Sequence, residues 1–383
     1  MEITKELQQL AKFSDPVLPV ISVYVKTPWA DHAQRAESLT FLNRHLHQAR
    51  APALESDAAR QSFARDLSRL EQWAATLLHE PSQSPAASVA LFACSGANIW
   101  VEFPSPIPFE NEFAILDRPA LRQLARLDAD YTNALVVLMD AQTARVCEVV
   151  LGGLLTEVYF GREDTDLPKL GGQLRYRRQI EDDAYHHYDD AYHHYEEVAE
   201  HVRGYYTERP ETDLILSGQE EVLTRFRQLL PPHIQGKIID TTDLDWRTTQ
   251  DRILLAARNI IEEHEIQEDQ ETVHLLLESA ARGGLGVIGL SDTLLAVNSG
   301  LVHKLVMHSD FQRLGWRCQE CHYIGSGQEI TSQCTVCNGA AIAVELGEAM
   351  VTEVLRHDGF FEPVAADARL AEHDGIGALL RHL

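Results

Sequence analysis

Two Cys-x-x-Cys pairs constrain the fold of this chain more than any other feature of its sequence. Cys318 and Cys321 form the first pair, and Cys334 and Cys337 form the second. Each pair can place two thiolates on a tight knuckle turn, and two knuckles complete a tetrahedral site for Zn²⁺. Because the protein fills all four positions, such a zinc ion would be structural, and the neighbouring His322 is surplus. A redox role suits two pairs in one short segment less well.

Cysteine usage also indicates the compartment. Four of the six cysteines lie in these pairs, which suits a metal site in a reducing compartment rather than a disulfide framework. Cys94 and Cys147 lie in apolar stretches, where we expect inert core residues. The sequence has no apolar run of the ~18 residues that a membrane span needs, and its N-terminus lacks the layout of a signal peptide. We therefore expect a cytoplasmic protein without a membrane partner.

The charge balance limits the partners. The chain of 383 residues carries 33 Lys and Arg against 58 Asp and Glu, a net charge of −25. Affinity for nucleic-acid backbones comes from Lys and Arg, so this composition excludes a general nucleic-acid coat, and we expect no DNA partner. RNA binding would require a local basic patch. The length and the 45% hydrophobic content suit about two to four folded domains.

Residues 1–125 have the pattern of an α/β domain. An apolar strand is followed by two stretches with helical spacing, and two further strands around Ser95-Gly96-Ala97 predict a hairpin. We expect two long surface helices. The predicted elements are strands at 17–25, 88–94 and 98–103 and helices around 39–46 and 63–77.

Residues 130–265 alternate between strands and helices, which implies a parallel-containing sheet covered by helices. We expect Ser217 and Glu220 to form a capping box at the start of one helix. The predicted elements are strands at 134–140, 144–150, 155–160, 213–216 and 237–240 and helices over 175–206, after 217, and over 248–264.

A seven-residue repeat marks the long helix of this central segment. Seven residues make two helical turns, so the tyrosines of the repeat fall on one stripe, which we interpret as an aromatic seam against the sheet or another helix. The histidines leave two alternatives. One is a metal site, because His186 with Asp190 and Asp190 with His194 are i, i+4 pairs; the other is a pH-responsive acidic face. The tyrosines are Tyr185, Tyr188, Tyr192 and Tyr195.

Residues 270–383 open with a glycine-rich stretch that leads into a helix. Ser291 is a natural N-cap for this helix, Gly300 should end it, and a strand follows. The chain closes with Gly-Ile-Gly-Ala-Leu-Leu-Arg at 375–381.

One short stretch, residues 167–178, is basic on this otherwise acidic chain. Gly171 and Gly172 form a loop that can adopt φ > 0 and bring N–H groups against another molecule, and Gln173 sits at its tip. A Gly-Gly turn by itself is ordinary. Here it stands among four basic residues and no acidic one. These are Lys169, Arg175, Arg177 and Arg178.

This tripeptide, the arginine-rich helix start after it, and the order of the segments resemble the class I peptide chain release factors of the archaeal and eukaryotic type. They also resemble the ribosome-rescue factor Pelota and bacterial homologues of both. Both ends of residues 270–383 resemble the same family. The resemblance implies a three-domain α/β architecture. Its parts are a codon-side domain (1–125), a central domain with the Gly-Gly-Gln loop (130–265), and an L7Ae/L30e-like domain (270–383) with a zinc ribbon (315–340).

The resemblance further implies a ribosome-associated translation factor. Gly171, Gly172 and Gln173 would promote hydrolysis of the peptidyl-tRNA ester in the peptidyl-transferase centre, and the four basic residues would contact ribosomal RNA. The implied partners are ribosomal RNA, peptidyl-tRNA and a translational GTPase. We expect a monomer.

Two departures from the family's pattern leave alternatives. The Asn-Ile-Lys-Ser stop-codon reader is absent from residues 47–57, where Arg50 is a single candidate RNA contact, and this favours codon-independent ribosome rescue over termination. Only Leu174 separates Gln173 from Arg175, a shorter spacing than in the family. The alternatives are a non-catalytic hibernation factor in the ribosomal A site, a tRNA-directed hydrolase or nuclease, and an acidic zinc-containing scaffold.

Overall fold

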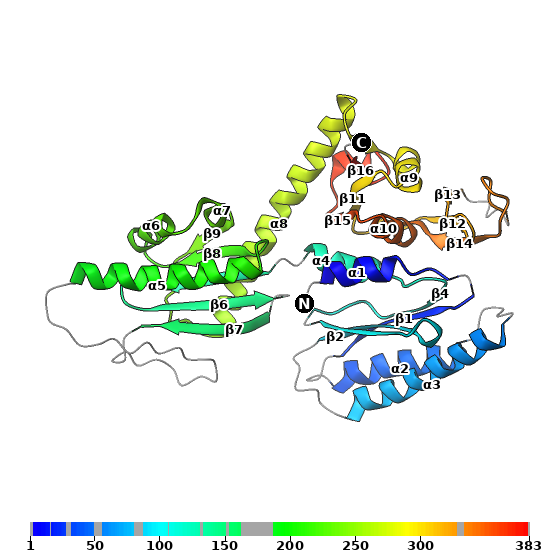
Figure 1. Ribbon diagram of the computed structural model, residues 1–383, viewed down its shortest axis with the longest axis horizontal. Coiled ribbons are helices and arrows are strands. Elements are labelled where there is room, and N and C mark those ends of the chain that lie inside the picture. Colours follow the sequence, from blue (N-terminus) through cyan, green and yellow to red (C-terminus); the bar gives the residue numbers. More distant parts are fainter. Residues whose placement is uncertain are drawn as a thin grey trace. The chain divides into compact units, whose positions relative to one another are not determined.

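The computed structural model describes residues 3–15, 17–27, 32–49, 56–79, 87–105, 107–130, 133–150, 153–161, 187–327 and 333–381. The chain forms two compact units, one from Met1–Asp130 with Glu268–Leu383 and one from Tyr131–Gln267. Both units combine strands with helices, which confirms the expected mixed α/β fold (Figure 1). The division into three domains stays a prediction.

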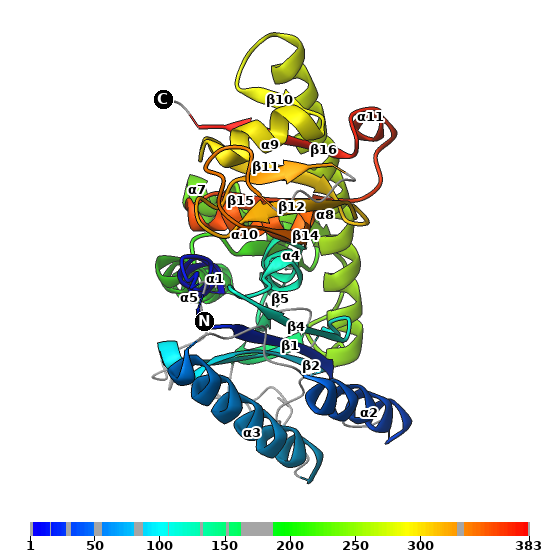
Figure 2. The same ribbon diagram turned by 90° about the vertical axis from the view of Figure 1, so that its right-hand side faces the viewer.

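The N-terminal part of the first unit is built on an antiparallel sheet with strand order β3-β2-β1-β4. The predicted hairpin is confirmed, because β2 pairs with β3 around the short helix Ser95–Ala97. Two long helices pack side by side on one face, as predicted, and share a core with β1 (Figure 2). The elements are β1 (Val20–Lys26), β2 (Ser88–Cys94), β3 (Ile99–Ser105), β4 (Glu112–Leu116), α2 (His32–Gln48) and α3 (Asp57–His79).

Two short helices that the sequence pattern did not indicate, α1 (Ile3–Ala11) and α4 (Arg122–Asp130), lie on the other side of this sheet (Figure 1). Tyr24 of β1 is fully buried on this side. Its ring meets Phe92 and Phe109 edge to face, and its hydroxyl donates a 2.6 Å hydrogen bond to the carbonyl of Ala120. The chain entering α4 is thereby fixed to the sheet.

Helix α4 begins against α10 (Leu346–Arg356) of the C-terminal part of the same unit. The Glu348 carboxylate accepts hydrogen bonds of 2.7 and 3.0 Å from the N–H groups of Leu121 and Arg122. A side chain from a distant segment thus satisfies donors at a helix start that have no partner inside the helix. Glu345 caps its own helix α10 and also pairs with the Arg122 guanidinium at 3.1 Å.

The C-terminal part of the first unit holds two sheets. The larger has the order β10-β16-β11-β15, in which β11 and β15 are parallel and the other pairs are antiparallel. The smaller has the order β13-β12-β14 and carries the cysteine pairs. The strands are β10 (Gly286–Ile288), β11 (Val302–His308), β12 (Leu314–Cys318), β13 (Ile324–Ser326), β14 (Ala341–Glu345), β15 (Phe360–Val364) and β16 (Ile376–Leu380), with the short helix α11 (Ala368–Ala371) between the last two.

Helix α9 (Leu290–Asn298) starts two residues earlier than the sequence indicated. Its N-cap is Gly289 at φ 82°, so the prediction of Ser291 as N-cap is wrong. The predicted end is confirmed. Gly300 adopts φ 65°, its N–H donates to Val297, and the N–H of Leu301 donates to Ala296, which is a Schellman motif.

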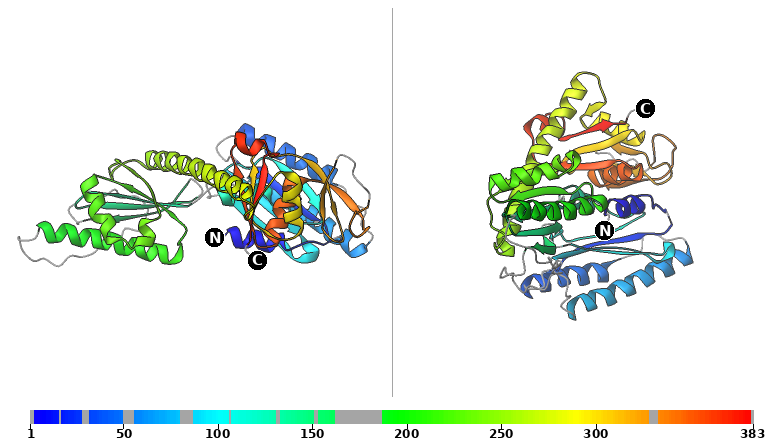
Figure 3. Two further views of the ribbon diagram at one scale, coloured as in Figure 1. Left: turned by 90° about the horizontal axis from the view of Figure 1, so that it is seen from above. Right: turned by 60° about the vertical axis from the view of Figure 1, so that its left-hand side comes forward.

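The second unit is a mixed sheet between two helical layers, with strand order β7-β6-β5-β8-β9. β5, β8 and β9 run parallel, whereas β6 and β7 are antiparallel neighbours. Helices α5 and α6 cover one face and α8 covers the other (Figures 1 and 3). The elements are β5 (Ala134–Met139), β6 (Ala144–Val150), β7 (Gly153–Phe160), β8 (Asp213–Ser217), β9 (Ile238–Thr242), α5 (His187–Glu208), α6 (Glu220–Leu229) and α7 (Pro232–Gln235).

The tyrosine seam packs on the sheet as interpreted, in the part of α5 whose side chains are described. Tyr195, Ala199, Val202 and Tyr206 are buried in one core with apolar residues of β5 and β8. The predicted beginning of this helix at 175 and the side chains of Tyr185, Tyr188 and Tyr192 lie outside the described residues.

The predicted capping box at Ser217 and Glu220 is wrong. Ser217 is the fully buried last residue of β8, and its hydroxyl donates a 2.7 Å hydrogen bond to the carbonyl of Leu244. The chain turns at Gly218, which has φ 148°, and α6 starts at Glu220 without a side-chain cap. The Ser217 hydroxyl is therefore used in a tertiary hydrogen bond and is not available to cap the helix.

Helix α8 (Gln250–Ala281) continues well past the predicted end at 264 and through the predicted boundary at 265–270. Its sequence contains neither glycine nor proline, so nothing local stops it before Gly283. Ile253 and Ile261 belong to the core of the second unit, whereas Val273 and Leu276 belong to the core of the first.

We expect Gly218→Ala to destabilise the second unit by about 3 kcal/mol or more, because a side chain strains this backbone conformation. A Cβ at this position would also lie 2.2 Å from the carbonyl oxygen of Met139. Gly204→Ala is the matched control, since no atom of the described residues lies within 4 Å of a Cβ there, and we expect a gain of roughly 0.5–1 kcal/mol. Hydrogen exchange of the β8 amides in urea measures both. Equal effects would contradict the prediction.

Glu348 should make the first unit less stable as the pH rises. Burial raises the pKa of this carboxyl from 4.5 to about 7, despite the N–H groups that it accepts. The stability that its protonated form contributes is therefore complete below about pH 4.5 and is lost as the pH rises through about 7. We expect the wild type to lose about 2–3 kcal/mol more than Glu348→Gln between pH 5 and pH 8. Parallel losses in urea denaturation of the two proteins would refute this.

Candidate functional site

The four cysteines of the two pairs come together at one end of the small sheet β13-β12-β14. The Sγ atoms of Cys318 and Cys337 lie 3.4 Å apart, and those of Cys321 and Cys334 lie 3.6 Å apart. All four Sγ atoms lie within 4.8 Å of one another. Tetrahedral Zn–S bonds of ~2.3 Å place sulfur atoms roughly 3.8 Å apart, so this arrangement fits a metal ion.

The two Cys-x-x-Cys pairs have the same local geometry. Sγ of the first cysteine accepts the N–H two residues later, from Glu320 in one pair and Val336 in the other, both at 3.3 Å. The N–H of that cysteine donates to the carbonyl five residues later, at Tyr323 and Gly339 respectively. The residue after the second cysteine is left-handed in both, with φ 61° at His322 and φ 62° at Asn338. These are the two predicted knuckles.

The first cysteine of each pair is buried and the second is exposed. Trp316 and Tyr323 pack against the buried sulfurs, and Cys318 and Cys334 share this small core with Ala341. Burial alone raises the pKa of the Cys318 thiol, but the N–H groups of Cys321 and Glu320 outweigh it and lower that pKa to about 7. Burial raises the pKa of the Cys321 thiol, and the hydrogen bond with Cys318 raises that of Cys337, so metal binding must displace protons at these two positions.

The site can hold a metal but offers no open coordination position, because four protein ligands complete a tetrahedron. Among the residues that the structure describes, this is the one group of at least three metal-ligating side chains. The alternative ligands on the central helix are not brought to such a group in the described part. His186 and the side chain of Asp190, which both predicted pairs require, lie outside it, so this alternative stays a prediction.

Cys94 and Cys147 are fully buried, as predicted for core residues. Burial raises the pKa of both thiols, that of Cys147 to about 12. A thiol that stays protonated is a poor nucleophile and a poor metal ligand. These two cysteines therefore pack as small apolar residues.

The loop predicted to be catalytic lies outside the described residues, which resume at α5 after β7. This applies to Gly171, Gly172 and Gln173 and to the basic residues Lys169, Arg175, Arg177 and Arg178. The codon-side turn with Arg50 also lies outside them.

Sequence reasoning missed a buried ion pair under α8. The guanidinium of Arg145 and the carboxylate of Glu157 pair between β6 and β7, where both residues are buried. Arg145 also donates a 2.6 Å hydrogen bond to the carbonyl of Thr248, and Gln250 donates to Glu157 at 3.1 Å. The pair thus fixes the start of α8 to the sheet. In the sequence, the only sign of this pair was a charged residue inside each of two largely apolar strands.

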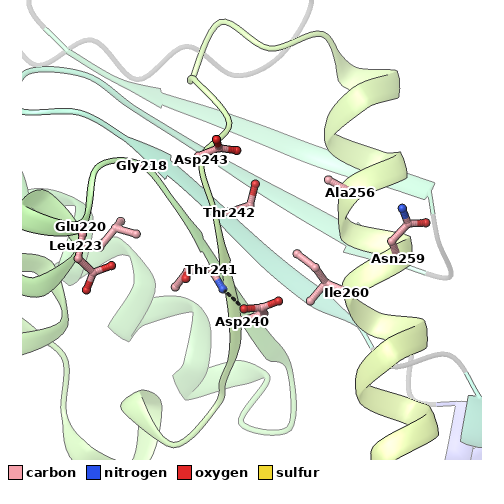
Figure 4. Close-up of a pocket in the computed structure, with 10 residues that line it drawn as sticks. All are labelled: Gly218, Glu220, Leu223, Asp240, Thr241, Thr242, Asp243, Ala256, Asn259 and Ile260. Carbon is pink, nitrogen blue, oxygen red and sulfur yellow. Dashed lines mark hydrogen bonds between the residues drawn. The ribbon is translucent and has the colours of Figure 1, made fainter.

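A pocket of about 570 Å³ in the second unit was also not predicted (Figure 4). It lies beside the last residues of the edge strand β9, between the start of α6 and the first third of α8. Glu220, Asp240 and Asp243 give it an acidic lining, with the hydroxyls of Thr241 and Thr242 and the amide of Asn259. Three separate elements contribute to it, so no sequence motif marks it.

Comparison with protein families gives one match. Residues 119–263 match the model of a family described as "Bacterial archaeo-eukaryotic release factor family 10". The matched stretch is less than half of the chain and contains positions 171–173. The match confirms, for this stretch, the resemblance to release factors of the archaeal and eukaryotic type and to their bacterial homologues. Comparison with curated proteins gives no match.

Several solved structures resemble the chain weakly. Archaeal translation termination factor aRF1 has 13% identity and a TM-score of 0.25 over 100% of this chain and 97% of its own. Pelota of Archaeoglobus fulgidus has 16% identity and a TM-score of 0.34 over 77% and 79%. Dom34 of S. cerevisiae has 9% identity and a TM-score of 0.40 over 74% of each chain. TM-scores this low do not define the fold.

We expect one divalent metal ion per chain. Cys318→Ser and Cys334→Ser should each lower the affinity for Zn²⁺ by roughly 100-fold or more, because each removes a thiolate from a closed site. Cys94→Ala is the control and should keep the wild-type affinity. Competition with a chromophoric chelator measures this, and Co²⁺ absorption reports a tetrahedral thiolate site. Metal binding that survives both serine substitutions would exclude the site.

Proposed function

We propose that this chain, whose residues 119–263 match a bacterial family of archaeo-eukaryotic release factors, is a ribosome-associated translation factor. The observation that carries the proposal is the position of this match, because it encloses Gly171, Gly172 and Gln173 together with the basic stretch around them. The proposed activity is codon-independent hydrolysis of the peptidyl-tRNA ester, in ribosome rescue.

The proposed mechanism is positional. The tripeptide Gly171–Gln173 offers no general base, so water must be activated by placement and by stabilisation of developing charge. The main-chain N–H of Gln173 donates to the oxyanion or to the departing 3′ oxygen, and the glutamine side chain restricts the site to water. Two glycines before it allow close approach of the main chain to the tRNA end.

The basic stretch supplies the affinity for RNA. Lys169, Arg175, Arg177 and Arg178 contact phosphates of ribosomal RNA and steady the loop. The remainder of the chain is acidic, so binding depends on these local contacts.

Codon-independent action is favoured by the absence of a reader motif. Residues 47–57, from the end of α2 to the start of α3, contain no Asn-Ile-Lys-Ser tetrapeptide. A factor that reads no codon acts on ribosomes that have stalled without a stop signal. Rescue is therefore preferred to ordinary termination.

In this proposal the C-terminal part of the first unit is an L7Ae/L30e-like domain with a structural zinc ribbon. The four-stranded sheet with α9 and α10 and the separate small sheet with four close cysteines support it. Zinc is preferred because a closed set of four thiolates suits this ion.

The proposed partners are ribosomal RNA, peptidyl-tRNA and a translational GTPase, with the chain itself a monomer. Two of the similar structures are described with partners of their own. One is a model of "ribosome-bound archaeal Pelota and ABCE1", and Dom34 is described as interacting with Hbs1. A cytoplasmic location follows from a ribosomal role. The described part of the chain contains no helix that is long and apolar enough to span a membrane.

A second candidate is a hibernation factor that occupies the A site without catalysis. The short spacing favours it, because only Leu174 lies between Gln173 and the first arginine of the basic stretch. A shorter connection limits how far the N–H of Gln173 can reach while the arginines hold phosphate.

Peptide release from ribosomes loaded with peptidyl-tRNA tests the proposal. Gln173→Pro removes the donating N–H and should slow release by roughly 10²–10³-fold, the loss expected for one oxyanion donor. Gln173→Ala keeps the N–H but removes the side chain and should also slow release. Gln270→Ala, on the exposed side of α8, is the control and should release at the wild-type rate.

The other outcomes distinguish the alternatives. Wild-type protein that sediments with ribosomes but releases no peptide would establish hibernation in place of rescue. Cleavage of free peptidyl-tRNA would indicate a tRNA-directed hydrolase or nuclease. No sedimentation with ribosomes would leave only an acidic metal-containing scaffold.

A further inference from the structure

Asp117–Leu121 connects β4 to α4 in the N-terminal part of the first unit, and we call this connection the latch. Its first two residues meet the C-terminal part of the same unit beside the cysteines. Asp117 pairs with the guanidinium of Arg317, which is next to Cys318 in the sequence. Arg118 lies 3.6 Å from the carboxylate of Glu353 on α10. Residues about 200 positions apart in the chain thus form one ionic cluster.

This cluster is buried. Arg118 is 4% exposed, Arg317 is 2% exposed and Glu353 is 4% exposed. The two guanidinium groups are close together, because both approach Nδ1 of His322. Burial together with Arg317 lowers the pKa of Arg118 to about 10. Within the described part of the chain, Nε and Nη1 of Arg118 have no hydrogen-bond partner. Such a group depends strongly on every partner that it does have.

Arg118 makes its shortest hydrogen bond to the cysteine knuckle. Its Nη2 donates to Nδ1 of His322 at 3.0 Å, and Nη1 of Arg317 approaches the same nitrogen at 3.5 Å. His322 directly follows Cys321 and has the left-handed φ of 61° that the knuckle requires. A histidine keeps this conformation only where its surroundings fix it.

We propose that the cysteine centre locks the latch: with metal bound, the knuckle holds His322 where it accepts the hydrogen bond of Arg118, and so keeps the N-terminal part docked on the C-terminal part. The proposal requires that the four cysteines bind a metal ion. It does not require the ribosomal function. The role of His322 is positioning, not metal ligation.

The other end of the latch provides an internal comparison. Leu121 and Arg122 are held by Glu348, and Arg122 is held by Glu345 and by the carbonyl of Phe311 at 2.6 Å. These contacts come from α10 and its surroundings rather than from the knuckles. Loss of metal should therefore loosen the Asp117 and Arg118 end more than the Leu121 end.

Hydrogen exchange of the full-length, Zn²⁺-loaded protein tests the lock. The N–H of Asp15 donates to the carbonyl of Asp117 at 3.0 Å, so peptides covering 13–18 and 112–120 report on the docked latch. Chelation with EDTA should speed their exchange roughly tenfold in the wild type, the fold-change expected when one hydrogen bond to a charged group is lost. The amides of β8 in the second unit should not respond.

Two variants separate the lock from simple loss of metal. His322→Asn should keep the metal, because asparagine tolerates a left-handed φ and occupies the equivalent position, Asn338, in the other knuckle. Its latch should exchange fast even with Zn²⁺ bound, and EDTA should add little. Asn338→Gly is the matched control and should behave as the wild type. Arg118→Met removes the donor from the other side and should reproduce the result of His322→Asn.

The proposal is overturned if EDTA removes the metal from the wild type without changing exchange in the latch. It is equally overturned if EDTA speeds latch exchange in Arg118→Met as much as in the wild type. Metal content, measured on each protein by mass spectrometry, distinguishes these results from failure of the metal site itself.

Discussion

Pairing of buried charge is the constraint on which the first unit depends. Arg118, Arg317 and Glu353 are each at most 4% exposed. A buried ion without a partner is very unfavourable, so these side chains permit only arrangements in which each meets an opposite charge. The partners come from both parts of the unit, because Asp117 and Arg118 precede α4 whereas Arg317 and Glu353 lie in β12 and α10. We infer that the cluster fixes how the parts dock more than it adds net stability, since apolar packing in its place would be about as favourable.

Much of the fold could be predicted where burial and local pattern agree. β5 and β6 were located nearly to the residue, because their apolar runs are buried between helices on both faces. The short helices α1 and α4 were not predicted, although both are amphipathic, because a helix of nine residues is marginal by itself and these two depend on contact with α10. Capping motifs failed at Ser217 and Ser291 for a related reason. A hydroxyl buried against Leu244, and a glycine already in a left-handed conformation at 289, decided those helix starts instead.

The metal centre could be predicted because the spacing of the cysteines identifies the ligands, and each pair folds locally into a knuckle. The residues that surround the centre could not be predicted. The sequence gives no sign that Arg118 reaches His322, because that contact spans 204 positions and depends on how two separate sheets dock. The same holds for the pair of Arg145 with Glu157 and for the acidic pocket beside β9, to which three elements contribute. Local motifs thus identify ligands, whereas tertiary structure decides what those ligands control.

The acidic composition does not conflict with the proposed binding of RNA. At physiological ionic strength, charges separated by more than ~8 Å of solvent are largely screened, so phosphate responds to nearby basic groups rather than to the net charge of −25. The stretch 167–178 concentrates four basic residues with no acidic one, which is the requirement for such a local contact. An acidic remainder also weakens non-specific binding to other nucleic acid, because every misplaced encounter brings carboxylates against phosphate. In the proposed function, the charge distribution of the protein would then direct the basic stretch to one RNA site without recognition of a codon.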